Sequence, residues 1–264
     1  RKLTLVHPFD DPLVIAGQGT VALEMLESQP DLDAMVIAIG GGGLISGMSV
    51  AAKSIRPDIR VFGIQTEAFP AMYAMFHDRP AACQPTSIAE GIAVKKPGLL
   101  TADLVRRFVD DVSLVSEDEI ETALIMLLEI EKTVVEGAGA AGLAGVLRYR
   151  EKFAGRKIGL VLSGGNIDST MLSDAIDREM VRSGRLARLR VDLRDVPGAL
   201  ARATQVIANA QGNIEEVHHQ RAFTALPARH TEVDFIVQTM GKEHVVQIID
   251  ELNRSGFHAS LHNH

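Results

Sequence analysis

Four consecutive glycines, Gly40, Gly41, Gly42 and Gly43, interrupt an apolar stretch that runs from residue 34 to residue 50. The run before them has the length and composition of a buried strand, and the run after them has helical character. Glycine permits positive φ angles and a close approach of the backbone to a ligand. Free N–H groups at a helix start, together with the helix dipole, favour a bound anion. The stretch therefore predicts a strand–turn–helix unit that holds a phosphate group, rather than a plain tight turn.

Strands and helices alternate along the first 182 residues, which favours an α/β fold. The β-rich runs lie at 34–39, 60–65, 111–115 and 157–162. After Lys157 the last of them is uninterruptedly apolar, which is typical of a strand covered on both faces of a parallel sheet. A capping box at Ser116 marks the start of one intervening helix. We expect residues 1–182 to form a mostly parallel sheet with helices on both faces.

A short basic segment, residues 183–187, has little to bury and is expected to be a linker. The segments after it alternate as strand, helix, strand, strand, helix and strand, at 188–194, 198–209, 213–221, 229–239, 242–254 and 257–261. This βαββαβ order is the ferredoxin-like arrangement. We therefore expect a second, α+β domain over residues 188–264.

The charge and composition exclude several classes of partner. A net charge of −7, with no basic stripe along any expected helix, argues against nucleic acid and anionic membranes as partners. No apolar run approaches the roughly 18 residues that a membrane-spanning helix needs. The single cysteine, Cys83, fits a reducing compartment. The sequence predicts a cytoplasmic protein.

A second glycine-containing turn, residues 161–169, follows the last expected strand of the first domain, with Ser163 at the end of that strand. In an α/β sheet, groups at the carboxyl ends of strands face the ligand. The P-loop pattern is absent because Leu44-Ile45 stands where Lys-Ser/Thr is needed, and the strict dinucleotide pattern also fails. A loosened dinucleotide pattern stays open, because Glu67 follows the next strand. The glycine turn would hold a phosphate group, and the Ser163 hydroxyl would lie at the opposite end of a flat ring. This combination indicates an aromatic phosphorylated cofactor.

Five segments, in order and at the spacing of the family, resemble the threonine dehydratases. These are threonine/serine ammonia-lyases of the fold-type II pyridoxal-phosphate enzymes, with serine racemase as a near relative. The segments are HPFDDPLVIAGQGTVALEML (7–26), VIAIGGGGLISGM (36–48), SIAEGIAVKKPG (87–98), VVEGAGAAGLAG (134–145) and VLSGGNID (161–168). The resemblance covers residues 5–182 and implies the large domain of that fold.

The resemblance implies pyridoxal 5'-phosphate as the cofactor, with the four glycines and Leu44 at its phosphate. It places Ser163 at the pyridine nitrogen, Gly164 beside it, and Glu136 near the ring. The implied reaction converts L-threonine to 2-oxobutanoate and ammonia, with L-serine to pyruvate as a side activity, in isoleucine biosynthesis. The amino-acid substrate is thus the expected small-molecule partner.

The segment 190–217, RVDLRDVPGALARATQVIANAQGNIEEV, resembles the start of an ACT domain, a small ligand-sensing module of amino-acid enzymes. The resemblance implies an amino-acid or nucleotide effector held by Gly198, Leu200, Asn213 and Ile214, and a homo-oligomer. Free N–H groups at a helix start suit a carboxylate. An ACT-like module that only dimerises remains an alternative.

Two features depart from the family. The Schiff-base lysine of the family lies in a Ser-x-Lys-x-Arg-Gly stretch, and nothing in this chain resembles it. We therefore expect the second half of such an enzyme, inactive by itself. The positions that bind a divalent ion in serine racemase-like relatives match Gln65 and Ala71, which offer no carboxylate, and Glu67 is off register. We expect no metal site.

Two other functions remain open. One is a non-catalytic amino-acid sensor with a vestigial cofactor cleft, and the other is a fold-type II lyase or racemase that acts on serine. A Ser-x-Lys-x-Arg-Gly segment upstream of residue 1 would separate the enzyme from the sensor. Turnover of L-threonine, L-serine and D-serine would separate the enzymes.

Overall fold

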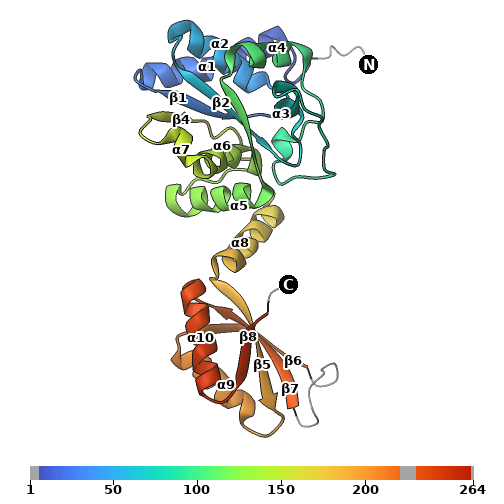
Figure 1. Cartoon of the computed structure of the whole chain (residues 1–264), viewed down its shortest axis with the longest axis vertical. Coiled ribbons are helices and arrows are strands. Elements are labelled where there is room, and N and C mark those ends of the chain that lie inside the picture. Colours follow the sequence, from blue (N-terminus) through green and yellow to red (C-terminus); the bar gives the residue numbers. More distant parts are fainter. Residues whose placement is uncertain (1–5, 221–229, 263–264) are drawn as a thin grey trace. The chain divides into compact units, whose positions relative to one another are not determined.

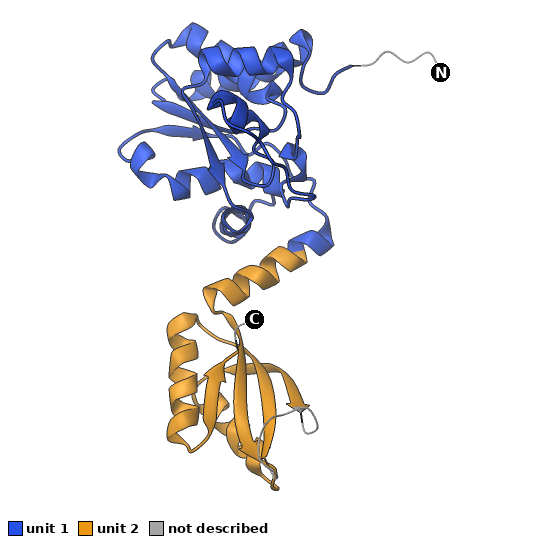
Figure 2. Cartoon of the chain, turned by 45° about the vertical axis from the view of Figure 1, so that its right-hand side comes forward, with its two compact units in different colours: residues 1–172 blue, residues 173–264 orange. Residues whose placement is uncertain are grey.

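A computed structural model describes residues 6–220 and 230–262, and it divides into two compact units, residues 1–172 and 173–264 (Figures 1 and 2). Helix α8 (Ser169–Ser183) crosses this division. The boundary expected at residue 182 lies at the end of that helix, and the expected linker runs into the first strand of the second unit. Residues 221 and 229, expected to end and begin strands, lie outside the described residues.

The first unit is built on a four-stranded sheet whose paired strands are all parallel. It contains β1 (Ala34–Ala38), β2 (Arg60–Thr66), β3 (Asp111–Val115) and β4 (Ile158–Leu160), in the order β3-β2-β1-β4. Val36 of β1 lies opposite Phe62 of β2 and Leu160 of β4, so β1 is a central strand. Every residue of β1 is buried, as a sheet covered on both faces requires. The predicted α/β class is confirmed.

Helices cover both faces of this sheet (Figure 1). One face carries α1 (Pro12–Ser28), α2 (Gly43–Ile55) and α4 (Leu99–Phe108), and the other carries α5 (Glu117–Met126) and α6 (Gly137–Arg148). Shorter elements are α3 (Ala71–Phe76), a 3-10 turn (Glu90–Ile92), a π-helical turn (Leu127–Glu131) and α7 (Arg150–Phe153). Met35, Ile37 and Ile39 form the main core with apolar side chains of α1 and α2. In α6, Gly145 lies against Ile64, which lets this helix approach the sheet.

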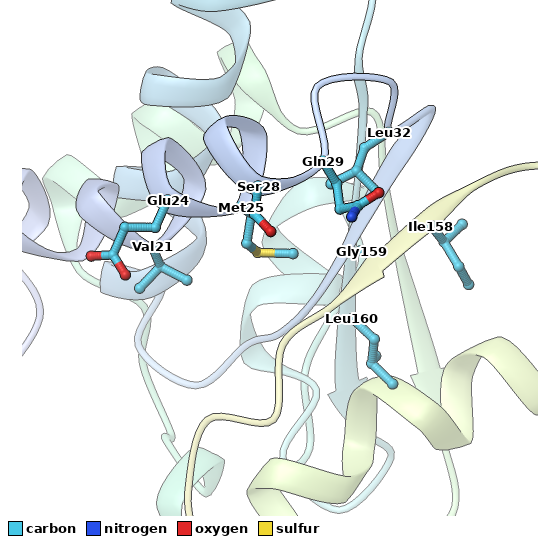
Figure 3. A pocket seen from close by; sticks show the side chains of 9 residues that line it. All are labelled: Val21, Glu24, Met25, Ser28, Gln29, Leu32, Ile158, Gly159 and Leu160. Carbon is cyan, nitrogen blue, oxygen red and sulfur yellow. The ribbon is translucent and has the colours of Figure 1, made fainter.

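β4 differs from the sequence prediction of a strand covered on both faces. Ile158 and Leu160 are half-buried, and Leu162 is exposed. β4 is an edge strand of the described sheet, and α1 covers it incompletely. A groove of about 450 Å³ remains between them, with Met25 and Leu32 against Gly159 (Figure 3).

The second unit has the ferredoxin-like order predicted from the sequence. After α8 come β5 (Leu186–Arg194), α9 (Ala199–Asn209), β6 (Asn213–Gln220), β7 (His230–Gln238), α10 (Lys242–Arg254) and β8 (His258–Leu261). The antiparallel sheet has the order β6-β7-β5-β8, and α9 and α10 cover one face of it (Figure 2). Leu189 and Val191 of β5 pack into the core with Ile207 and Ile248 of the helices. A search of the described helices for a bilayer-spanning segment finds none.

The helix-free face of this second sheet holds a buried ion pair. Arg190 donates to Asp234 through Nε at 2.9 Å and through Nη2 at 3.1 Å, and Asp234 is 4% exposed. The Arg190 guanidinium outweighs burial and holds the pKa of Asp234 below its ordinary value. Because the folded-state pKa is lowered, this carboxylate stabilises the fold above the unfolded-state pKa near 3.8, and the contribution is lost as pH falls through the folded-state value.

We expect Asp234→Asn to lower the free energy of unfolding of this unit by about 1–3 kcal/mol at pH 7, because it breaks a bidentate charged contact. The difference from wild type should shrink below pH 4. Urea unfolding followed through NMR resonances of the Leu189 and Val191 methyl groups measures it. The control is Glu251→Gln, which removes an exposed partner of Arg254 and should cost less than about 0.5 kcal/mol. Equal losses in the two variants would contradict the assignment.

Candidate active site

The glycine turn between β1 and α2 is closely packed by other segments of the chain. A Cβ atom on Gly40 would lie 2.9 Å from the Cα atom of Ile92. Gly42 has a φ of +96°, and a Cβ atom there would lie 2.5 Å from the Met72 side chain. A larger residue would displace a neighbouring segment or force an unfavourable backbone conformation. Tertiary packing thus holds the shape of this turn.

The N-terminus of α2 lacks the kind of cap that neighbouring helices have. Asp11 caps α1, and Ser116 caps α5 within the predicted capping box. The N-cap of α2 is Gly42, which makes no side-chain hydrogen bond, and its first turn contains no acidic residue. Gly41, Gly42 and Gly43 are buried, and Gly40 is half-buried. A buried helix start without an acceptor is suited to an external anion.

Asp10 connects the first segment of the chain to this turn. Its carboxylate accepts the backbone N–H groups of Leu99 at 3.0 Å, Leu100 at 2.9 Å and Thr101 at 3.1 Å, and so caps α4. The Thr101 hydroxyl donates a 2.7 Å hydrogen bond to the Gly41 carbonyl. Asp10 and Thr101 are not among the predicted site residues, because their partners lie far away in the sequence.

The segment 87–94 borders the glycine turn and is held by Glu117. The Glu117 carboxylate accepts hydrogen bonds from the Ser87 hydroxyl at 2.9 Å and from the Ile88 N–H at 2.6 Å. It also accepts a 2.6 Å bond from the Thr66 hydroxyl at the end of β2. Glu117 therefore fixes a loop that contacts Gly40, a role that its place in a capping box does not reveal.

Glu136 lies between two glycine-containing loops at the start of α6. Its N–H donates a 3.1 Å hydrogen bond to the Gly164 carbonyl. A Cβ atom on Gly91 would lie 2.9 Å from its Oε1, and one on Gly164 would also collide with this carboxylate. Burial raises the pKa of Glu136, and the charge of Glu90 raises it further. A carboxyl group with a raised pKa in a cleft is a candidate for holding or moving a proton.

Ser163 follows β4 at the same edge of the sheet as the glycine turn. The Val161 N–H donates to the Val36 carbonyl at 3.3 Å, so β4 and β1 still run side by side as they approach this edge. Ser163 is exposed, and its hydroxyl has no hydrogen-bond partner among the described residues. The two predicted ends of the cofactor site therefore follow adjacent parallel strands.

A cavity of about 600 Å³ lies beside Glu136, between the segment around Glu90 and the loop that follows Gly164. Its wall is formed by Ile88, Glu90, Glu136, Asn166, Ile167, Asp168, Ser169 and Met171. A cavity of this size suits a small ligand.

The residues predicted to hold an effector are not all brought together within one chain. Gly198 is the N-cap of α9, with a φ of +84°, whereas Asn213 follows the C-terminal end of that helix. An 11-residue helix is about 16 Å long, which separates them. Leu200 and Ile214 both pack against the core of the unit. Asn213 donates to the Gln238 side chain at 3.1 Å.

The positions considered for a metal serve the fold. The Gln65 side chain donates to the Ile39 carbonyl at 3.3 Å and accepts from the Tyr73 N–H at 2.9 Å. Glu67 pairs with Arg148 at 2.8 Å. Within the described ranges, no group of three His, Cys, Asp or Glu side chains could hold a metal ion. The absence of a metal site stays a prediction.

Comparison with known families gives two matches in this chain. Residues 1–164 match the family described as "Pyridoxal-phosphate dependent enzyme", and residues 187–254 match the ACT domain. An L-threonine ammonia-lyase of Geobacter sulfurreducens is 44% identical over 259 residues, which are 97% of this chain and 64% of that protein. The chain therefore spans less than two thirds of that relative.

Two solved structures each resemble about two thirds of this chain. The processed form of threonine deaminase isoform 2 from Solanum lycopersicum superposes with a TM-score of 0.63 at 31% identity, covering 66% of this chain and 52% of that one. Serine racemase from Dictyostelium discoideum superposes with a TM-score of 0.58 at 38% identity, covering 62% of this chain and 54% of that one.

Proposed function

The chain belongs to the family of pyridoxal-phosphate dependent enzymes, and on that premise we propose that it is part of a threonine ammonia-lyase with an ACT regulatory domain. The reaction would convert L-threonine to 2-oxobutanoate and ammonia, with L-serine as a second substrate. The likeness to an L-threonine ammonia-lyase over almost the whole chain supports this substrate.

One observation carries the proposal: the start of α2 is buried, rich in glycine and free of any side-chain cap. The N–H groups of Gly41, Gly42, Gly43 and Leu44 would hold the phosphate of the cofactor, with Gly40 giving the turn its close packing. The absence of acidic side chains from the first turn of α2 favours a dianion there. The residues present therefore fit the phosphate end of the group.

The other end of the site also fits. Ser163 offers an unpaired hydroxyl that can donate to the pyridine nitrogen, and Gly164 gives Glu136 room beside it. When bound, pyridoxal phosphate supplies a conjugated ring that takes up electron density from the substrate. A neutral serine at the nitrogen leaves that nitrogen largely unprotonated, which suits prompt loss of a β-hydroxyl group. Glu136, with its raised pKa, can hold a proton at the edge of the cleft.

Assay of the complete natural protein tests the proposed reaction. L-threonine should yield 2-oxobutanoate faster than L-serine yields pyruvate, and D-serine should not form from L-serine. Faster racemisation of L-serine than deamination of L-threonine would favour the serine racemase alternative. The structural likeness to a serine racemase supports that alternative. No turnover of any of these amino acids would favour a non-catalytic sensor.

Ser163→Ala in the complete protein should lower kcat for L-threonine about three- to tenfold, because it removes one neutral hydrogen bond at the ring. Ser54→Ala is the matched control, since Ser54 is exposed on α2 and donates only to the Val50 carbonyl. It should leave kcat unchanged. Equal kcat in wild type and Ser163→Ala would exclude Ser163 from the cofactor site.

We also propose that the second unit senses an effector, because ACT domains are ligand-sensing modules. The effector-binding residues stay a prediction; they are Gly198, Leu200, Asn213 and Ile214. Because α9 separates Gly198 from Asn213, these two residues could hold one ligand only across two copies of the chain. This arrangement favours a homo-oligomer. We propose a cytoplasmic location, because the chain has a single cysteine and a net charge of −7.

A further inference from the structure

The segment that leads into α1, residues 7–10, lies directly against the glycine turn. The Phe9 ring packs on Gly41, because a Cβ atom on that glycine would collide with the ring carbons. A Cβ atom on Gly43 would lie 3.0 Å from the Phe9 Cβ atom. The next residue, Asp10, caps α4. In a closely packed interior, the position of this segment limits where the glycine turn can lie.

His7 holds this segment through its imidazole ring. Its Nδ1 accepts a 2.8 Å hydrogen bond from the Asp10 N–H and a longer one, at 3.4 Å, from the Phe9 N–H. A ring nitrogen accepts a hydrogen bond only while it carries no proton, so the geometry requires a neutral ring with its proton on Nε2. The half-buried ring also meets the Phe9 ring edge to face, with the centroids 4.6 Å apart.

The charged groups around this segment are occupied or exposed. Asp10 gives its carboxylate to the first N–H groups of α4, and Asp11 gives its own to the first N–H groups of α1. The first turns of α2 and α4 contain no acidic residue. Lys95 and Lys96, in the loop before α4, are exposed. Protonation of His7 would therefore place a second donor opposite the Asp10 N–H and remove the acceptor that holds it.

We propose that His7 is a positioning residue of the cofactor site. As a neutral ring it fixes the backbone at Phe9 and Asp10, and through them the turn that receives the phosphate. The proposal rests on the cofactor site proposed above and adds a residue that acts through its neighbours rather than on the phosphate. It also makes the shape of the turn dependent on pH, because an acidic medium turns the acceptor into a donor.

Two substitutions separate the acceptor from the bulk of the ring. In His7→Asn, the side-chain oxygen can accept the Asp10 N–H in place of Nδ1 and does not titrate. In His7→Leu, the space is filled without an acceptor. The 15N amide shifts of Gly41 and Gly43 in the ligand-free chain should move in His7→Leu and stay near the wild-type values in His7→Asn. Acidification from about pH 8 to about pH 5 should move the wild-type shifts toward those of His7→Leu and leave those of His7→Asn in place.

His244 provides the matched control, because its Nδ1 accepts the Met240 N–H at 3.0 Å in the second unit. His244→Asn and His244→Leu make the same two changes there and should leave the Gly41 and Gly43 shifts unchanged. Unchanged shifts in His7→Leu would overturn the proposal. Equal movement in His7→Asn and His7→Leu would also overturn it, since the turn would then depend on the size of the ring and not on its acceptor.

Equilibrium dialysis of pyridoxal phosphate at about pH 8 connects the turn to the cofactor. The Kd should rise about three- to tenfold in His7→Leu, because the Asp10 N–H loses its acceptor. It should change less than about twofold in His7→Asn and in both His244 variants. Equal Kd values for wild type and His7→Leu would contradict the role of His7 in the cofactor site. If the wild-type chain binds no pyridoxal phosphate, the cofactor site proposed above fails by itself, and the amide shifts still decide whether His7 positions the turn.

Discussion

Gly47→Ala is expected to destabilise the first unit by about 3 kcal/mol, whereas Gly17→Ala is expected to stabilise it by about 0.5–1 kcal/mol. Both substitutions add one methyl group to a helix and have the same intrinsic helix propensity gain. They differ in what the methyl group meets. The pair therefore isolates tertiary packing from local preference.

Helices α1 and α2 touch through their backbones at this point. A Cβ atom on Gly47 would lie 2.7 Å from the Gly19 nitrogen and would also collide with the Ile15 carbonyl oxygen. Backbone atoms cannot rotate away, so the helices would have to separate and open the core between them. Gly17 is two residues from Ile15 and from Gly19, on the exposed side of α1, and a Cβ atom there would meet nothing within 4 Å. The helix contact also supports the glycine turn, because α2 starts from it.

Tyrosine fluorescence provides a reporter confined to the first unit. The chain contains two tyrosines and no tryptophan, and Tyr73 and Tyr149 both lie in that unit. Urea unfolding followed at this signal should show a lower midpoint for Gly47→Ala and a slightly higher one for Gly17→Ala. Similar midpoints for the two variants would mean that the helices adjust to the methyl group, and the packing argument would fail.

The features that sequence analysis found depend on residues close together in the chain. The capping box at Ser116 involves Glu119, three positions away, and the structure contains it. The glycine turn was recognisable because a buried strand and a helix flank it directly. The βαββαβ order followed from regular alternation, and β5 buries every second residue. In each case the signal and its partner share one short segment.

The features that it missed depend on contacts between distant segments. Glu117 looked like part of a helix start, but it holds Ser87, 30 positions away, beside the glycine turn. The last apolar run looked like a strand covered on both faces, but it lies at the edge of the described sheet. Gly198 and Asn213 lie at opposite ends of α9 within one chain, and their role in holding an effector stays a prediction. Spacing along the chain does not define these distances, because they arise only when distant segments of one unit pack together.

Asp10→Ala is expected to weaken binding of pyridoxal phosphate about tenfold or more, whereas Asp11→Ala should change it less than about threefold. Each aspartate caps one helix, and each loss should cost about 1 kcal/mol of stability. Only Asp10 contacts the helix that is hydrogen-bonded to the glycine turn, where we propose that the cofactor phosphate binds. Without it, the first N–H groups of α4 lose their acceptor, and Thr101 loses the position from which it holds the Gly41 carbonyl.

Equilibrium dialysis of pyridoxal phosphate, with 15N amide shifts of Gly41 and Gly42 in the free protein, tests this connection. The amide shifts matter because they report on the turn before any ligand is present. Asp10→Ala should move them and Asp11→Ala should not. Thr101→Val provides a further comparison, since it removes the hydroxyl and keeps the Asp10 cap, and should reproduce most of the loss in affinity. If Asp10→Ala and Asp11→Ala weaken binding equally, the loss reflects general destabilisation, and the glycine turn is held by its own packing rather than through α4.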